Sequence, residues 1–360
     1  MGKASSPHEL GGRRWALRGL LALAAVGLVV LLAEIGMRWL ADRPWYERLE
    51  EQLVHSKTPL LPVGTMRFRL RAELPGEEVH EGNAYRILFL GDSFTYGSGV
   101  ENDRLVFPAL ATQRLQELEA SGSGRRFEFF NGGIPGSLTK RWLLLFGESA
   151  DLFDPQMVVV VFFLRDGTKN LGSRKKITDI REAMDRLRGE SALMEHSRLF
   201  RFLSEKRIQQ EVSRDYLEAM RKAYRGDASD TEEWRNAQSN LLALRDAARE
   251  RGSDFALVIF PVLYGLKGEY PLDTVMAEIE QFAQANEISY LSLLPAFEGE
   301  DEVDLWISPT DQHPNEKGHA IAAEAMADFL AAKIAGATGE SAPSGSRTPP
   351  LQSPPAGRFE

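Results

Sequence analysis

The chain has 360 residues, a length typical of one large domain or two modest ones. Its 52 acidic side chains exceed its 43 basic ones, and the net charge of -9 disfavours nucleic acid as a partner, because phosphate-binding surfaces carry a basic excess. Cysteine is absent, which excludes disulfides, thiolate catalysis and sulfur-ligated metals.

The N-terminal segment has the composition of a membrane anchor. An unbroken apolar run covers residues 19–33 and follows a cluster of arginines at 13–18. Extended to 15–40, the run is long enough to cross the roughly 30 Å hydrocarbon layer as a helix. The basic flank predicts that 1–14 lies in the cytoplasm and that the rest of the chain faces outward. We expect a single-pass anchor; a cleaved signal peptide is the alternative, although no convincing small-x-small cleavage site follows the run.

Two further segments flank the expected domain. Residues 41–84 contain charges, scattered prolines and little periodicity, which predicts a stalk and the entry to the domain. Residues 335–360 are rich in Pro, Ser and Gly, and we expect them to be disordered. At the outer end of the anchor, Glu34 and Arg38 are spaced to pair on one helix face.

From residue 85 to residue 334 the pattern alternates between strand-like and helix-like runs. The expected strands are 86–90, 127–130, 157–163, 255–260 and 289–294. The run MVVVVFF at 157–163 is β-branched and aromatic, which predicts a central strand covered on both faces. Helical spacing covers 105–120 and 138–150. Strands joined by helical crossovers indicate an α/β fold, a doubly wound (flavodoxin-like) parallel sheet of about five strands flanked by helices.

Residues 167–235 interrupt this alternation. They are dense in charged side chains, and their apolar residues are spaced for amphipathic helices, as in 177–187 and 216–224. We interpret the segment as a helical insertion beside the edge of the sheet that holds the site. A substrate-binding cap and a plain pair of solvated helices are both open interpretations.

The tripeptide Gly91-Asp92-Ser93 follows the first expected strand directly. Ligands bind beyond the carboxyl ends of strands in an open parallel sheet, so Ser93 is expected to face the site. Gly91 permits a tight turn, and the N–H of Ser93 can point toward a developing oxyanion. The glycines of Asn-Gly-Gly-Ile-Pro-Gly, at 131–136 after the second strand, either bring a backbone N–H close to a ligand or only form a turn.

Asp311 and His313 lie just ahead of the last expected helix. Two residues apart in an extended loop, they project to the same side, so the carboxylate can orient the imidazole while its other nitrogen takes a proton from serine. A helix-capping Asn315 beside a chance histidine is the alternative. A structural role is expected for His196 and His319. A metal site at Asp311 and His313 lacks an evident third ligand.

Three blocks resemble, in order and spacing, those of the SGNH/GDSL hydrolase superfamily: GDSFTYG at 91–97, NGGIPG at 131–136 and DQHPNEKGH at 311–319. The resemblance covers residues 85–334. It implies that Ser93 is the nucleophile, that His313 and Asp311 complete a triad, and that the N–H of Gly133 is an oxyanion donor. It implies no metal and no organic cofactor.

The chain departs from the family pattern at two places. The third block of the family offers an asparagine as a further oxyanion donor, but Arg165 occupies that position. We expect Arg165 to enter the nucleophile's pocket and stabilise the oxyanion or grip an anionic part of the substrate; a surface ion pair, for instance with Asp166, is the alternative. One residue separates Asp311 from His313, where the family often has two, and this shorter form also resembles polysaccharide O-acetyltransferase relatives.

The expected activity is carboxylic-ester hydrolysis by an extracytoplasmic enzyme held at the membrane. The leading substrate class is an O-acetylated envelope glycan, because the anchor holds the domain near the wall or exopolysaccharide. A lysophospholipid or other lipid ester is the second. Acyl transfer to a polysaccharide and a non-catalytic carbohydrate-binding domain are the alternatives.

Overall fold

The computed structural model describes residues 7–40, 60–73, 84–119, 124–168, 173–308 and 311–338. The chain divides into two compact units, which we call the helical unit (1–55 and 173–215) and the sheet unit (56–172 and 216–360). Most of the expected stalk, at 41–59 and 74–83, and of the expected tail, at 339–360, lies outside the described residues.

Helix α1 (Pro7–Leu40) contains the expected membrane segment. Residues 18–38 are long and apolar enough to cross a membrane, a requirement that a signal sequence meets as well. Most of their side chains are exposed and none is fully buried in a protein core; Leu23, for example, is 74% exposed. Exposed leucines and valines along a whole helix are unfavourable in water, and they suit a lipid surrounding.

The insertion is helical, as its spacing predicts. It forms α6 (Ser173–Glu190), α7 (Ala192–His196) and α8 (Arg198–Arg225). Met184 of α6 and Met194 of α7 are fully buried, and Phe200 and Ile208 of α8 pack against them. The insertion therefore has a small hydrophobic core of its own.

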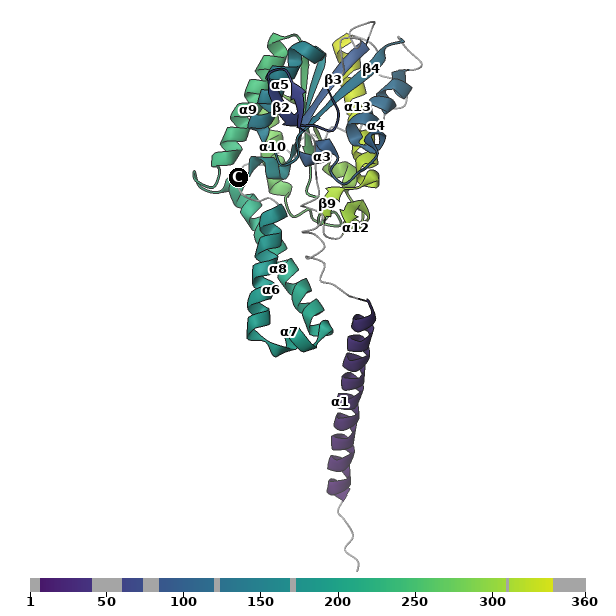
Figure 1. The fold of residues 1–360 in the computed structure, drawn as a ribbon. Coiled ribbons are helices and arrows are strands. Elements are labelled where there is room, and N and C mark those ends of the chain that lie inside the picture. The colour runs from purple at the N-terminus through teal and green to yellow at the C-terminus, as the bar shows by residue number, and fades with distance from the viewer. Residues whose placement is uncertain are drawn as a thin grey trace, which may run out of the picture. The chain divides into compact units, whose positions relative to one another are not determined.

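The sheet unit is built on a five-stranded parallel sheet in the order β4-β3-β5-β6-β7, which confirms the expected doubly wound fold (Figure 1). The strands are β3 (Ala84–Gly91), β4 (Arg126–Gly133), β5 (Met157–Phe163), β6 (Asp254–Phe260) and β7 (Ser289–Ser292). Every residue of central β5 is buried, which explains its continuous apolar sequence. Gly91 pairs with both Gly133 and Val161, so the carboxyl ends of β3, β4 and β5 stand side by side.

Helices cover both faces of this sheet (Figure 1). The longer ones are α4 (Phe107–Glu119), α5 (Thr139–Phe153), α9 (Glu232–Glu250), α10 (Asp273–Ala285) and α13 (Glu316–Thr338). Successive side chains of β5 point to opposite faces: Phe162 contacts Trp142 of α5 and Trp234 of α9, whereas Phe163 stacks on Phe94. Each face thus has its own aromatic core.

Short elements complete the sheet unit. They are the helices α3 (Ser93–Tyr96), η2 (Asp103–Leu105), η3 (Leu164–Gly167), α11 (Leu294–Phe297) and α12 (Glu302–Leu305) and the hairpin of β8 (Trp306–Ser308) with β9 (Asp311–Pro314). The turns α3 and η3 directly follow β3 and β5, and β9 directly precedes α13. All three elements carry residues that the sequence analysis singled out.

A second hairpin lies within the segment assigned to the stalk and the entry to the domain. It pairs β1 (Leu60–Val63) with β2 (Met66–Arg69). Phe68 and Leu70 are fully buried in the main core, and the Arg141 guanidinium lies 4.9 Å from the centre of the Phe68 ring. The chain therefore joins the core within β1, where Val63 is buried, and this is earlier than the periodicity predicts, because strands this short give little signal.

Replacing Phe68 with Ala should lower the free energy of unfolding by about 3–5 kcal/mol, since it removes a fully buried aromatic ring. Arg69→Ala, an exposed position on the same strand, is the matched control and should change stability by less than about 0.5 kcal/mol. Urea unfolding followed by near-UV circular dichroism measures both. Equal stability of the two variants would show that the hairpin is peripheral to the core.

Candidate active site

Ser93 is positioned by a tight turn between β3 and α3. Asp92 caps α3, its Oδ1 accepting the N–H of Phe94 at 2.8 Å. Glycine is required at position 91, because a Cβ there would lie 2.0 Å from Thr95 Oγ1. The turn leaves Ser93 at the carboxyl edge of the sheet, largely buried and at the first position of the helix.

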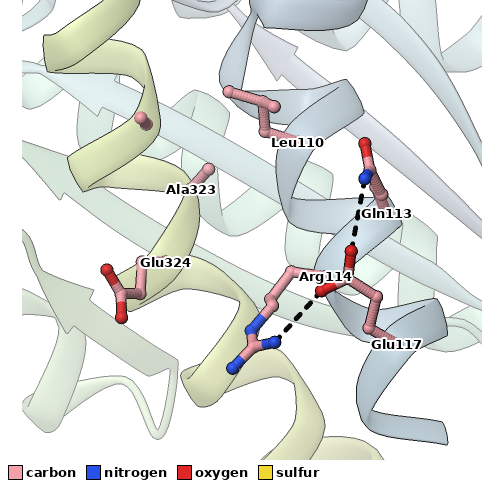
Figure 2. A pocket seen from close by; sticks show the side chains of 7 residues that line it. Leu110, Gln113, Arg114, Glu117, Ala323 and Glu324 are labelled. Atoms are coloured by element: carbon pink, nitrogen blue, oxygen red, sulfur yellow. Dashed lines mark hydrogen bonds and ion pairs between the residues drawn. The ribbon is translucent and has the colours of Figure 1, made fainter.

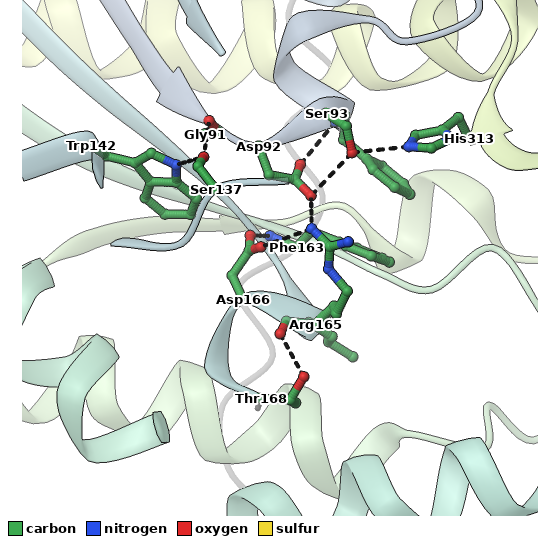
Figure 3. Close-up of polar contacts among 12 residues, drawn as sticks. Gly91, Asp92, Ser93, Ser137, Trp142, Phe163, Arg165, Asp166, Thr168 and His313 are labelled. Atoms are coloured by element: carbon green, nitrogen blue, oxygen red, sulfur yellow. Dashed lines mark hydrogen bonds and ion pairs between the residues drawn. The ribbon is translucent and has the colours of Figure 1, made fainter. Parts of the chain in front are cut away.

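His313 meets Ser93 from strand β9 (Figure 3). Its Nε2 lies 2.9 Å from Ser93 Oγ, and its Nδ1 lies 2.5 Å from Asp311 Oδ1. Burial raises the pKa of Asp311, but the hydrogen bonds and charge of His313 outweigh it and hold the pKa below its usual value. An ionised Asp311 accepts the proton of Nδ1, which leaves Nε2 free to accept one from Ser93.

Asn315 and the other two histidines considered above have structural positions. Asn315 caps α13, and its Oδ1 accepts the N–H of Gly318 at 3.1 Å. The expected cap is therefore present, and it occurs together with the contact between His313 and Ser93. His319 is fully buried, and its Nδ1 accepts the N–H of Phe107 at the start of α4. Burial lowers the pKa of His319 to about 3, so this side chain stays neutral and joins α13 to α4. His196 ends α7 in the helical unit.

Two backbone N–H groups were expected to serve as oxyanion donors. The N–H of Ser93 belongs to the first turn of α3, where helical N–H groups lack intrahelical partners. The N–H of Gly133 donates to Asn131 Oδ1 at 3.0 Å. Glycine is needed at 133, because a Cβ would lie 2.1 Å from the backbone N of Tyr96. Gly133 thus lies against α3, the helix that begins at Ser93, and its N–H is occupied by the side chain of Asn131.

Arg165 lies in η3 and forms an ion pair that the sequence analysis missed. Its Nη2 donates to Asp92 Oδ2 at 2.7 Å, and the same oxygen is 3.3 Å from Ser93 Oγ (Figure 3). A longer contact of 3.8 Å joins it to Asp166, and the arginine side chain is only 17% exposed. Arg165 is therefore beside Ser93 and not on the surface. The opposite charges of Asp92 and Arg165 are visible in the sequence, but only the strand order shows that the two residues follow neighbouring strands.

Asp166 lies beneath this pair and is fully buried. Its Oδ2 accepts the N–H of Phe163 at 2.8 Å, while its Oδ1 has no hydrogen-bond partner within the described part of the chain. Burial and the charge of Asp92 raise the pKa of Asp166 well above its usual value, despite the opposing effect of Arg165. The buried position therefore favours the protonated form of Asp166, and the closer ion pair of Arg165 is the one with Asp92.

A surface pocket lies between α4 and α13 (Figure 2). Its lining consists of Leu110, Gln113, Arg114, Glu117, Ala320, Ala323 and Glu324. Arg114 is paired with Glu117 at 3.0 Å, as is common for exposed residues one helical turn apart. The pocket includes none of the residues around Ser93, and the candidate site is therefore the edge of the sheet.

Comparison with known proteins assigns the chain to a family. Residues 89–321, more than half of the chain, match the GDSL-like Lipase/Acylhydrolase family. A comparison with curated proteins found no match. Similar solved structures include a two-domain esterase active on acetylated mannans (17% identity, TM-score 0.42, covering 77% of this chain and 56% of that one). Others are an acetylxylan esterase from Geobacillus stearothermophilus (14% identity, TM-score 0.40, 68% and 94% covered) and a psychrotrophic esterase from Pseudoalteromonas sp. (16% identity, TM-score 0.38, 70% and 99% covered).

Likenesses with identities and TM-scores this low carry no argument, whereas the family match spans the expected motifs from the end of β3 to the start of α13. The chain belongs to the GDSL-like lipase/acylhydrolase family and is an ester-hydrolysing enzyme.

Proposed function

We propose that the protein is a membrane-anchored serine esterase whose triad is Ser93, His313 and Asp311. The observation that carries the proposal is the continuous hydrogen-bonded line from Ser93 Oγ through His313 to Asp311, with distances of 2.9 and 2.5 Å. A serine hydroxyl is a weak nucleophile at neutral pH, so it needs a base in hydrogen-bond reach and a group that orients that base. Each of these needs is met here by a named side chain.

In the proposed reaction, Ser93 Oγ attacks the acyl carbonyl carbon while its proton passes to His313 Nε2. Asp311 stabilises the imidazolium that forms. His313 then protonates the leaving alcohol, and the ester C–O bond breaks to give an acyl-enzyme. A water molecule then gives a proton to the same imidazole and attacks the acyl carbon. The bond between this carbon and Ser93 Oγ breaks, His313 returns the proton to Oγ, and the carboxylic acid leaves.

The negative oxygen of the intermediate needs hydrogen-bond donors. The N–H of Ser93 is the first proposed donor, since it belongs to a helix start where such groups are unpaired. Gly133 is the second, once the side chain of Asn131 turns away from its N–H. The requirement for glycine at position 133 supports this, because no side chain there could fit beside α3.

Arg165 has an electrostatic role in this proposal. An unpaired Asp92 carboxylate 3.3 Å from Ser93 Oγ would compete with His313 for the hydroxyl proton and repel the developing oxyanion. The ion pair of 2.7 Å with Arg165 cancels that charge. Whether Arg165 also donates directly to the oxyanion is decided by the experiment below.

The substrate we propose is an uncharged acyl ester, most simply an O-acetyl group on a cell-envelope glycan. Two observations support it. The charge of Arg165 is already matched by Asp92, so this pair offers no net positive charge for an anionic substrate. Helix α1 is long and apolar enough to hold the enzyme at a membrane, and the preceding arginines favour an extracytoplasmic sheet unit.

A serine-directed fluorophosphonate should form an adduct on Ser93, located by mass spectrometry. Ser93→Ala should abolish the adduct and lower kcat on an acetyl ester by on the order of 10⁴- to 10⁶-fold with the fold intact. Ser98→Ala, in the same loop, is the control and should react normally. Full activity of Ser93→Ala would refute the serine mechanism. Acetate release that depends on an added sugar acceptor would indicate transfer in place of hydrolysis.

Arg165→Met should lower kcat on a neutral ester by about 10²- to 10³-fold, the size of effect seen when an oxyanion-stabilising group is lost. If charge compensation is the cause, adding Asp92→Asn should restore much of the activity, since asparagine also caps helices. Without rescue, Arg165 is a direct donor to the oxyanion. A rise in KM confined to anionic esters would instead assign Arg165 to substrate binding and contradict the proposed role.

Asp166→Asn should flatten the dependence of stability on pH. Because the folded-state pKa of Asp166 is raised, its stabilising contribution is present below the unfolded pKa of 3.8 and is lost as pH rises through the folded pKa. The unfolding free energy of the variant relative to wild type should therefore increase from about pH 5 to pH 9 in urea titrations. Asp230→Asn, an exposed carboxyl, is the control. Parallel curves for wild type and Asp166→Asn would contradict the assigned protonation.

A further inference from the structure

Within the helical unit, the outer end of α1 is hydrogen-bonded to the start of α8. The carboxylate of Glu34 accepts the Ser197 hydroxyl at 2.8 Å and the N–H groups of Arg198 and Leu199 at 2.8 and 2.9 Å. These are the first N–H groups of a long helix, which lack intrahelical partners and carry partial positive charge. Glu34 is thus the anion that satisfies this helix end, and its side chain is only 16% exposed.

Arg38 adds further hydrogen bonds to the contact between α1 and the start of α8. Its guanidinium donates to Glu34 Oε1 at 3.2 Å and to the carbonyl oxygen of His196 at 3.1 Å. The guanidinium of Arg198 donates in return to the carbonyl oxygen of Arg38 at 3.2 Å. Removal of α1 as a signal peptide would leave these groups without their partners. The contact therefore supports a retained anchor with a structural role.

Exposed apolar side chains surround this junction. Leu193 and Leu203 are each 56% exposed, and Phe202 is 38% exposed. They lie within six residues of Ser197, or about 9 Å along a helix. The ammonium group of Lys206 lies 5.9 Å from the centre of the Phe202 ring. Large apolar side chains flanked by lysine or arginine are typical of helices that lie in a membrane interface.

We propose that α7 and the first two turns of α8 rest on the outer membrane surface, with Leu193, Phe202 and Leu203 inserted among the lipids beside α1. The inference rests on the proposed anchoring by α1. Arg38 ends the apolar span, and Glu34 lies one helical turn before it. In the proposed arrangement, both side chains lie near the boundary between hydrocarbon and headgroups. A carboxylate at that depth is costly unless it is hydrogen-bonded, and α8 supplies the donors.

Lipid is the proposed partner of this apolar surface, because the position of the junction along α1 sets its depth in the membrane. Side chains within about 9 Å of the hydrogen bonds between Glu34 and α8 would lie at the level of the headgroups and upper acyl chains. Lys206 would then extend toward the lipid phosphates while its stem covers apolar surface. The insertion thereby gains a second attachment to the membrane, next to the first.

The chain contains no cysteine, so single cysteines can be labelled cleanly with an environment-sensitive fluorophore. The full chain is reconstituted in phosphatidylcholine–phosphatidylglycerol vesicles that contain doxyl-labelled lipids. Leu32→Cys reports the anchor, Leu203→Cys the proposed contact, and Arg214→Cys an exposed site eleven residues farther along α8. We expect strong quenching at positions 32 and 203, and at least threefold weaker quenching at 214.

Quenching at 32 without quenching at 203 would overturn the proposal and leave the anchor intact. No quenching at 32 would instead contradict the anchor, and the present proposal with it. Adding Glu34→Ala should reduce quenching at 203 while leaving that at 32 unchanged, whereas Glu211→Ala, an exposed glutamate on α8, should affect neither. Unchanged quenching at 203 in the Glu34→Ala chain would show that Glu34 does not hold the contact.

Discussion

The parallel pairing of β3 with β4 and β5 is the constraint on which the rest of the site depends. This register sets Gly91 level with Gly133 and Val161, so three strands end at one edge. Because each strand is followed at once by a turn, the residues after all three strands gather within hydrogen-bonding reach of one another. The β8–β9 hairpin only has to add His313 and Asp311 to a site whose other members are already in place.

Three ionisable side chains meet at this edge of the sheet. Asp92, Arg165 and Asp166 bring two carboxyl groups and one guanidinium into a largely buried space. Buried ion pairs rarely stabilise a fold, because desolvation offsets the attraction between the charges. The raised pKa of Asp166 reduces the conflict, since it favours the uncharged form of this carboxyl group. The closest charges to Ser93 are then the paired Asp92 and Arg165.

The same physical logic recurs at the end of α1. In both places a carboxylate is held by the first N–H groups of a helix: Asp92 by α3 and Glu34 by α8. At α3 this contact shapes the turn that presents Ser93. At α8 it joins the insertion, which has its own small methionine core, to the helix that we propose crosses the membrane.

Much of the fold and part of the site followed from the sequence alone. The five strands were predicted within a few residues of their bounds, because a buried parallel strand is a continuous run of apolar residues in the sequence. Ser93, Asp311 and His313 were singled out by short motifs next to such runs, and the structure brings these three side chains together. Composition also marked the apolar stretch of α1.

Only the tertiary structure decided the partners of these groups. Local spacing cannot show that Arg165 pairs with Asp92 or that the N–H of Gly133 donates to Asn131. Nor can it show that Glu34 accepts a hydrogen bond from the start of α8. The hairpin of β1 and β2 was missed for a related reason, because its assignment to the core depends on the distant side chain of Arg141 and on the main hydrophobic cluster. Periodicity is a property of neighbours along the chain, whereas hydrogen-bond and ion-pair partners are chosen by proximity in space after the chain has folded.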